Sequence, residues 1–324
     1  MHWAFEQESE KSGLKDSRFR QAYHQFWEYY NARGEKPVLA YFSDAFPHKE
    51  SKISAKMNEK LDSGKPLPAN TAYYQWDNEQ SCAQIWRTYL VQEWFNRSES
   101  EDKQGFIDLI NEVFRKFTAP LDSAENPDFA VKELYGRLSN QKAILMVRFA
   151  DGRTIPFWSL PAGYLRIFSM VLDIACRSYL LNKHCNAEGV VLIDEIDLHL
   201  HPSLAAEILP RLRRTFSRVQ FIVSTHSPMV ITSYLCDEDN YLYKLLRDEE
   251  GYASVRLSNQ YGLDYSTALY YTMDTPEPYA YLQNLKSTYM FWKSRNRQDI
   301  MEKIKSDIIK VVGEDSQFYK TLEA

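Results

Sequence analysis

The stretch that decides the fold is VVLIDEIDLHLHP, from Val190 to Pro202. Its first four residues form a short aliphatic run, which predicts a buried strand. Two carboxylates, Asp194 and Glu195, follow this run directly. Ligands of open parallel sheets bind at the carboxyl ends of the strands, so the two acids are expected at a ligand-binding edge. Strand ends are also often acidic merely because they meet solvent.

The segments around this stretch predict a parallel sheet. A second β-branched run, Val219–Val223, follows a helical stretch from Ser203 to Phe216. This strand, helix, strand order is a βαβ unit. Residues 164–181 are apolar nearly all round, which predicts a buried helix, and residues 37–42 predict another buried strand. The predicted fold class is therefore α/β.

The sequence as a whole predicts that the chain is divided into three parts. Residues 1–140 are expected to be mainly helical, with one short strand at 37–42. Residues 141–245 form a lobe with the parallel strands; Asp151-Gly152 within it predicts the tip of a hairpin. Residues 246–324 form a mostly helical extension, whose isoleucine stripe near residues 300–312 predicts a core or partner contact.

The composition limits the class of protein. The chain has 324 residues, is 44% hydrophobic and carries a formal net charge of -5, which argues against a surface built entirely for a polyanion. Its four cysteines show no metal spacing, and no run of some eighteen apolar residues occurs. We expect a cytoplasmic protein with reduced thiols and no membrane contact.

A histidine is predicted at the same edge as the two acids. The second parallel strand ends in VSTHSP, which places His226 one βαβ step from Glu195. A lone histidine in a loop usually only bonds to backbone. Its pairing with Asp194 and Glu195 favours a catalytic role, in which Asp194 orients a Mg²⁺ shell and Glu195 polarises an attacking water.

A third element is the start of the buried helix, Ser159–Tyr164. Free N–H groups and the helix dipole favour a phosphate there. The alternative is an ordinary helix start, with Pro161 in the first turn and Gly163 incidental.

In this order and spacing, LPAGY, VVLIDEIDLHLHP and STHSP resemble the signature, Walker B with D-loop, and switch-histidine motifs of ABC-class ATPases of the RecF and SMC type. The chain more closely resembles the AAA family ATPases of the PtuA type, from Septu and retron anti-phage systems. That likeness extends to PVLAYF at Pro37, to VQEWFNRSESE at Val91 and to the tail from Gln260. It implies the C-terminal lobe of an ABC-ATPase-like (P-loop NTPase) fold, with a helical inserted region and a helical tail.

The resemblance assigns roles by matching position. It implies that Asp194 is the Walker B aspartate that binds Mg²⁺, Glu195 the catalytic glutamate and His226 the switch histidine. It also implies a nucleotide-contacting set from the signature motif and the D-loop, namely Pro161, Gly163, Tyr164 and Asp197. The implied cofactors are ATP and Mg²⁺, sandwiched between two ATPase heads, so that a homodimer or higher homo-oligomer takes part in catalysis.

The sequence departs from the family pattern in two ways. No GxxxxGK[ST] occurs in these 324 residues, since Gly34-Glu-Lys36 and Gly64-Lys65 lack the spacing. We therefore expect either the C-terminal portion of a longer protein or a truncated chain, in both cases inactive alone. Pro161 stands where the signature motif usually has serine, so stabilisation of phosphate would depend on the Gly163 backbone and the helix N-terminus.

The leading functional prediction is an ATP-hydrolysing regulatory subunit of an anti-phage complex that controls a nuclease effector. The resemblance implies an HNH nuclease (PtuB-like) partner and, in retron versions, a reverse transcriptase with its RNA-DNA hybrid; nucleic acid would be contacted through the complex. One alternative is a non-hydrolysing binding or scaffold module. Another is a nuclease-linked ATPase of the overcoming-lysogenization-defect type, for which Asp237-Glu-Asp239 is only an isolated acidic turn.

Overall fold

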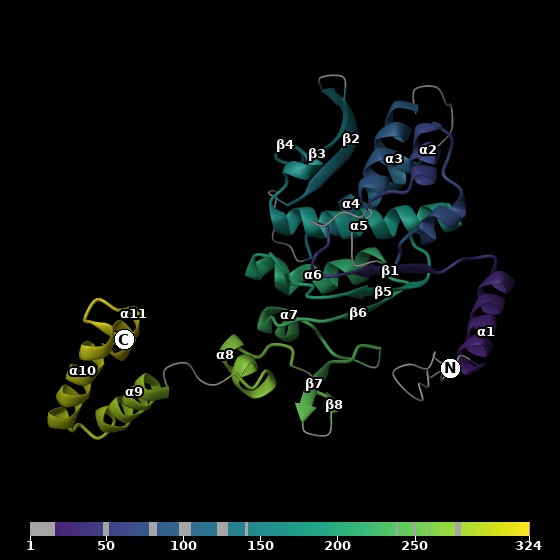
Figure 1. Ribbon diagram of the computed structural model, residues 1–324. Coiled ribbons are helices and arrows are strands. Elements are labelled where there is room, and N and C mark those ends of the chain that lie inside the picture. Colours follow the sequence, from purple (N-terminus) through teal and green to yellow (C-terminus); the bar gives the residue numbers. More distant parts are fainter. Residues whose placement is uncertain are drawn as a thin grey trace.

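The parallel sheet is the centre of the molecule. The computed structural model describes residues 17–47, 52–77, 83–96, 105–121, 129–139, 142–237, 239–248, 251–258, 260–275 and 280–323. Within them the sheet has the order β1–β5–β6 (Figure 1), and its strands are Val38–Phe42, Gly189–Ile193 and Val219–Val223. Both pairings are parallel, and the register brings together the last residue of each strand, which is Phe42, Ile193 or Val223. The predicted βαβ unit and the α/β class are thus confirmed.

One face of this sheet is covered by the buried helix. α5, Ala162–Asn182, is buried along almost its whole length and packs against β1 (Figure 1). The sheet residues in this core alternate along the strands, as the two-residue period of a strand requires; they include Val38, Ala40, Phe42, Val191 and Ile193. α6, Pro202–Thr215, connects β5 to β6 and adds Leu204, Ile208 and Leu212 to the same core.

The other face of the sheet is open among the residues that the structure describes. Leu192 and Ile222 are partners in register there, and their side chains are 37% and 53% exposed. Leu39, Tyr41 and Val190 on the same face are only half-buried. Parallel sheets are normally covered on both faces, so this apolar surface is unusual for a complete α/β domain.

A second, antiparallel sheet lies on the opposite side of α5 from the first (Figure 1). It has the order β2–β3–β4, with bounds Val131–Ser139, Lys142–Phe149 and Thr154–Pro156. The hairpin predicted at Asp151-Gly152 is confirmed as β3–β4. The expectation of a single short strand before residue 141 is wrong, because β2 pairs with β3 along its length and the expected boundary falls inside that hairpin. Gly136 and the exposed Arg137 and Leu138 interrupt the alternation that would have predicted β2.

Two further helices, α3, Ala83–Asn96, and α4, Phe106–Thr118, pack against α5. α4 is strongly amphipathic and buries Ile110, Phe114 and Phe117. The short 3₁₀ turns are Ala69–Tyr73 and Phe157–Ser159. The α-helices are α1 Ser17–Arg33, α2 Ala55–Asp62, α3 Ala83–Asn96, α4 Phe106–Thr118 and α7 Pro228–Thr232. Residues 97–101, the end of VQEWFNRSESE, lie outside the described part of the chain.

The C-terminal part begins with a small hairpin, β7 Tyr243–Asp248 and β8 Gly251–Arg256. It continues through α8 Tyr265–Thr267 and a π turn, Ala268–Thr272. α9 Ala280–Lys293, α10 Gln298–Val312 and α11 Gln317–Glu323 then form a unit that lies away from the sheets (Figure 1). The predicted isoleucine stripe supplies this unit's own core, which contains Tyr289, Ile304, Ile308 and Leu322. No helix in the described ranges is both long enough and apolar enough to cross a bilayer.

Candidate active site

The two acids follow β5 directly, and backbone hydrogen bonds fix the chain there on both sides. The N–H of Asp194 donates to the carbonyl of Phe42 at the end of β1, at 2.8 Å. On the other side, the N–H of Ser224 donates to the carbonyl of Ile193 at 2.9 Å. These two bonds extend the pairing of β5 with β1 and with β6 by one residue. Asp194 therefore lies between the ends of β1 and β6.

The Asp194 carboxylate is held by hydroxyl groups. The Tyr41 hydroxyl donates to Oδ2 at 2.6 Å, and the Ser224 hydroxyl lies 3.4 Å from Oδ1. Asp194 is half-buried. These hydroxyl contacts fix the orientation of the carboxylate, whose oxygens are ligands of the kind that Mg²⁺ prefers.

Glu195 has an uncommon backbone conformation. Its φ is +45°, in the left-handed region that non-glycine residues seldom enter. Two hydrogen bonds hold it there: its N–H donates to Ser224 Oγ at 2.9 Å, and its carbonyl accepts from the N–H of Leu198 at 2.9 Å. A conformation that the surrounding bonds impose on a half-buried acid is characteristic of functional sites.

The segment that carries His226 is hydrogen-bonded to residues 194–201, the loop between β5 and α6, which we call the acidic loop. The N–H of Ile196 donates to the carbonyl of Ser224 at 3.1 Å, and the Thr225 hydroxyl donates to the Asp197 carboxylate. Thr225 Oγ1 also accepts the N–H of Ser227 at 3.0 Å. The side chain of His226, between these bonded residues, is exposed. The structure therefore brings together Asp194, Glu195, Asp197 and the His226 segment, while their chemical roles stay predictions.

The first turn of α5 touches the far end of the same loop. Pro161 is the exposed N-cap residue, and its carbonyl accepts from the N–H of Leu165 at 2.9 Å. Gly163 is buried, and a Cβ on it would lie 2.5 Å from the carbonyl oxygen of His199. An incidental Gly163 is therefore excluded by packing, because no side chain fits between α5 and this loop.

Tyr164 points into the aromatic core. Its ring stacks on Phe168 with centroids 5.9 Å apart and meets Phe129 edge-on at 5.3 Å. Such packing gives the residue a structural role. Its assignment to the nucleotide, like that of Pro161, stays a prediction.

Arg166 is the main residue that sequence reasoning missed. Its side chain is fully buried, and its guanidinium donates to backbone carbonyls in the loops that follow β1 and β5. Burial lowers the pKa of Arg166, while the carboxylates of Asp44, Glu195, Asp194 and Asp197 raise it. A charged residue in a mostly apolar helix was the available signal. Ser224 and Tyr41 were also missed, although both lie in segments that the motifs include.

The residues at this edge fit a magnesium ion that arrives with a phosphate. Among the described residues no group of three or more His, Cys, Asp or Glu side chains could hold a metal ion. Mg²⁺ bound with nucleotide needs only one or two carboxylates, because phosphates and waters complete its shell. Asp194, with Ser224 beside it, therefore provides enough protein ligands for a Mg²⁺ ion that is bound together with a nucleotide. His201 is the N-cap residue of α6, and its Nδ1 accepts from the N–H of Ser203.

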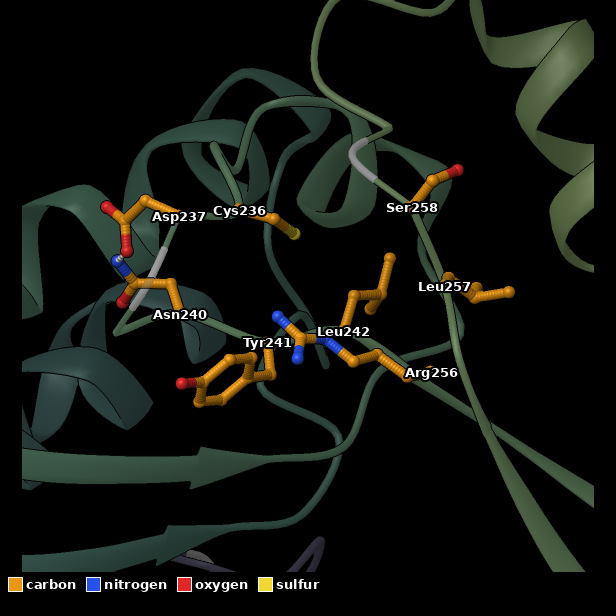
Figure 2. Close-up of a pocket in the computed structure, with 8 residues that line it drawn as sticks. All are labelled: Cys236, Asp237, Asn240, Tyr241, Leu242, Arg256, Leu257 and Ser258. Atoms are coloured by element: carbon orange, nitrogen blue, oxygen red, sulfur yellow. Dashed lines mark hydrogen bonds between the residues drawn. The ribbon is translucent and has the colours of Figure 1, made fainter.

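A surface pocket of about 450 Å³ lies elsewhere, between the segment after α7 and β8 (Figure 2). It is lined by Cys236, Asp237, Asn240, Tyr241, Leu242, Arg256, Leu257 and Ser258. Arg256 extends over the Tyr241 ring, 4.2 Å from its centroid, and Asn240 contacts the Asp237 carboxylate. None of the predicted site residues contributes to it, so the candidate active site is the edge of the sheet.

A parallel sheet with acids at its carboxyl edge is an arrangement that α/β ligand-binding proteins share. Residues 71–232, half of the chain, match the family described as "AAA domain, putative AbiEii toxin, Type IV TA system". The chain belongs to this family. The match includes Gly163, Asp194, Glu195 and His226.

The similar proteins include two that are named as retron probable ATPases and one that is named as a Septu protein. The chain is 31% identical to "Retron Vc95 probable ATPase" of Vibrio cholerae serotype O1 biovar El Tor, over 60% of this chain and 36% of that protein. It is 35% identical to "Retron Ec83 probable ATPase" of Escherichia coli, over 40% and 26% respectively. "Septu protein PtuA" of Bacillus mycoides (strain KBAB4) is 37% identical, over 32% and 15%. The predicted resemblance to PtuA-type ATPases is confirmed, and the chain spans only 36%, 26% and 15% of the length of these three relatives.

Solved structures that are similar to the chain include SMC heads. One comes from work on "ATP-driven dimerization and DNA stimulated activation of SMC ATPases", with 14% identity, a TM-score of 0.35 and coverage of 51% of this chain and 89% of that one. Another is the SMC head domain from Thermotoga maritima, with 15% identity, a TM-score of 0.33 and 52% coverage of both chains. Overlap at this level has no bearing on function.

Proposed function

We propose that this chain provides the catalytic edge of an ATPase that hydrolyses ATP and regulates an effector in an anti-phage defence complex. The observation that carries the proposal is the bonded group formed by the Asp194–Asp197 loop and the Ser224–Ser227 segment at one edge of a parallel sheet. Membership in an ATPase family supports the reaction class, and the retron and Septu relatives support the biological setting.

The chain's own residues suit the hydrolysis of a phosphoanhydride. Glu195, held in the left-handed conformation beside Ser224, would accept a proton from the attacking water and orient it toward the γ-phosphate. His226 would hydrogen-bond the same phosphate from the neighbouring strand. Asp194 would hold Mg²⁺, which when bound draws charge from the phosphate oxygens.

The N–H groups of Ala162 and Gly163 in the first turn of α5 would bind phosphate oxygens of a nucleotide on a second head. Gly163 allows this turn to approach the loop closely, since it has no side chain. Nucleotide would then join two heads, and their association would control a nuclease such as an HNH (PtuB-like) protein. In a retron setting the partner set would include a reverse transcriptase with its RNA-DNA hybrid.

A second candidate is a module that binds a partner and hydrolyses nothing. The exposed apolar face of the sheet, with Leu192 and Ile222, favours it. In the described part of the chain no strand pairs with the outer edge of β6, so a strand from elsewhere can add there. The two candidate functions are compatible if a phosphate-binding lobe packs on this face of the sheet.

Glu195→Gln in the complete protein tests the proposal. Hydrolysis should fall about 10²- to 10⁴-fold, the usual contribution of a general base, while ATP stays bound and the dimer persists. The matched control is Glu133→Gln, which neutralises a carboxylate on β2 that pairs with Arg148, away from the sheet edge. Equal turnover in Glu195→Gln and wild type would refute the assignment, and a complete protein that binds no ATP would favour the non-hydrolysing module.

A further inference from the structure

We propose that Arg166 is a positioning residue that couples the N-terminus of α5 to the catalytic carboxylates. The proposal rests on the proposed ATPase function, and it assigns to one buried side chain the link between phosphate binding at the helix and the placement of Glu195.

The first observation is the set of bonds that Arg166 makes. Its Nη2 lies 2.7 Å from the carbonyl oxygen of Asp194 and 3.4 Å from that of Glu195. Its Nη1 donates to the loop after β1, within 3.0 Å of the Ser43 carbonyl and 3.2 Å of the Asp44 carbonyl, and it also bonds the Phe46 carbonyl. One guanidinium thus joins the two loops that leave the sheet at the catalytic edge.

The second observation is that the first turn of α5 contacts the same acidic loop twice. Gly163, three residues before Arg166, approaches the His199 carbonyl so closely that a Cβ would come within 2.5 Å of it. Arg166 holds the beginning of the loop at Asp194, and Gly163 faces its end. A rotation or shift of the helix must therefore move the acidic loop as a unit, because close-packed interiors transmit displacement.

The third observation is electrostatic. The carboxylates of Asp44, Asp194, Glu195 and Asp197 all interact with the Arg166 guanidinium. A single buried cation that is permanently charged reduces the repulsion among these acids and keeps their loops together. Lysine cannot replace it, since one ammonium group lacks the planar fork that reaches two loops.

These observations predict how the site responds to phosphate. An anion bound by the N–H groups of Ala162 and Gly163 pulls on the first turn of α5, and Arg166 passes this displacement to the carbonyl of Glu195. The catalytic carboxylate would be aligned only when the helix has engaged its phosphate. A displacement of about 1 Å is enough to change a rate on the order of 10²-fold.

The test compares Arg166→Lys with Arg211→Lys in the complete protein. Arg211 is a matched control, because it is also buried and donates to two carbonyls, Phe117 at 3.0 Å and Ala119 at 2.7 Å, at the C-terminal end of α4, which is not part of the site. Arg166→Lys should lower kcat on the order of 10²-fold while the Kd for ATP changes less than about threefold. Arg211→Lys should lower the thermal midpoint similarly but leave kcat within about threefold of wild type. Equal losses of kcat in the two variants, or an unchanged kcat in Arg166→Lys, would overturn the proposal.

A second readout does not depend on activity. Amide hydrogen exchange should quicken in Arg166→Lys at both loops together, at Asp194 and Leu200 in the acidic loop and at Phe46 after β1, whose N–H groups are bonded in the native chain. Arg211→Lys should leave these amides unchanged. Faster exchange at only one of the two loops would refute the coupling. If wild type hydrolyses no ATP but both loops respond, the proposed function fails while the coupling stands.

Discussion

The buried ion pair on α5 allows a stability prediction in detail. Asp173 and Arg177 are 1% and 2% exposed, and the Asp173 carboxylate accepts from Arg177 Nε and from the Trp86 indole N–H. Arg177 also donates to the Ala72 carbonyl at 2.6 Å, which ties the 3₁₀ turn to the helix. Asp173→Asn keeps the volume and one acceptor but leaves the buried guanidinium without its counter-charge. Removing one partner of such a pair typically costs about 3–5 kcal/mol.

The loss is large enough to measure by urea unfolding. With a slope of about 1–3 kcal/mol/M, a cost of about 3 kcal/mol lowers the urea midpoint by roughly 1–3 M. Trp86 beside the pair makes tryptophan fluorescence a suitable probe. Glu133→Gln is the control: its pair with Arg148 is 28% and 40% exposed, so the change should cost less than about 1 kcal/mol. Equal midpoints for Asp173→Asn and Glu133→Gln would refute the reasoning, whereas Asp173→Asn with Arg177→Met should recover part of the loss.

Three further predictions concern other features. Gly163→Ala should destabilise the chain by about 1–3 kcal/mol in urea, despite the higher helix propensity of alanine, because its Cβ meets the His199 carbonyl at 2.5 Å; a gain in stability would contradict this packing. The bidentate Arg218 guanidinium lowers the pKa of Glu35 below its ordinary value of 4.5, so Glu35 stabilises the fold above about pH 4.5 and loses this contribution as the pH falls through its folded-state pKa. Unfolding of wild type and Glu35→Gln should therefore differ at pH 7 and converge at low pH, and a constant difference would speak against it. Burial raises the pKa of the Cys185 thiol to about 12, so iodoacetamide at pH 8 should alkylate it in unfolded but not folded protein, as peptide mass spectrometry would show.

Local sequence predicted the elements that depend on local pattern. A βαβ unit is predicted by the aliphatic runs of β5 and β6 and by the helical pattern between them. Such periods can be recognised from residues that are close in the sequence. Acids directly after a buried strand must lie at its carboxyl end, so Asp194 and Glu195 could be placed at the sheet edge. β2 was missed because its alternation is broken at Gly136, and its strand character depends on pairing with β3.

Only the tertiary structure decided how the site is held. Tyr41 reaches Asp194 from 153 residues away in the chain, and Arg166 reaches Ser43 from 123. Neither contact can be predicted from the local periodicity of the sequence, because each depends on which loops the sheet order β1–β5–β6 brings together. The sequence by itself determined the α/β class, the ATPase family and the acidic edge. The packing of α5 against that edge determined why residue 163 is glycine and why a charged arginine is buried beneath the acids.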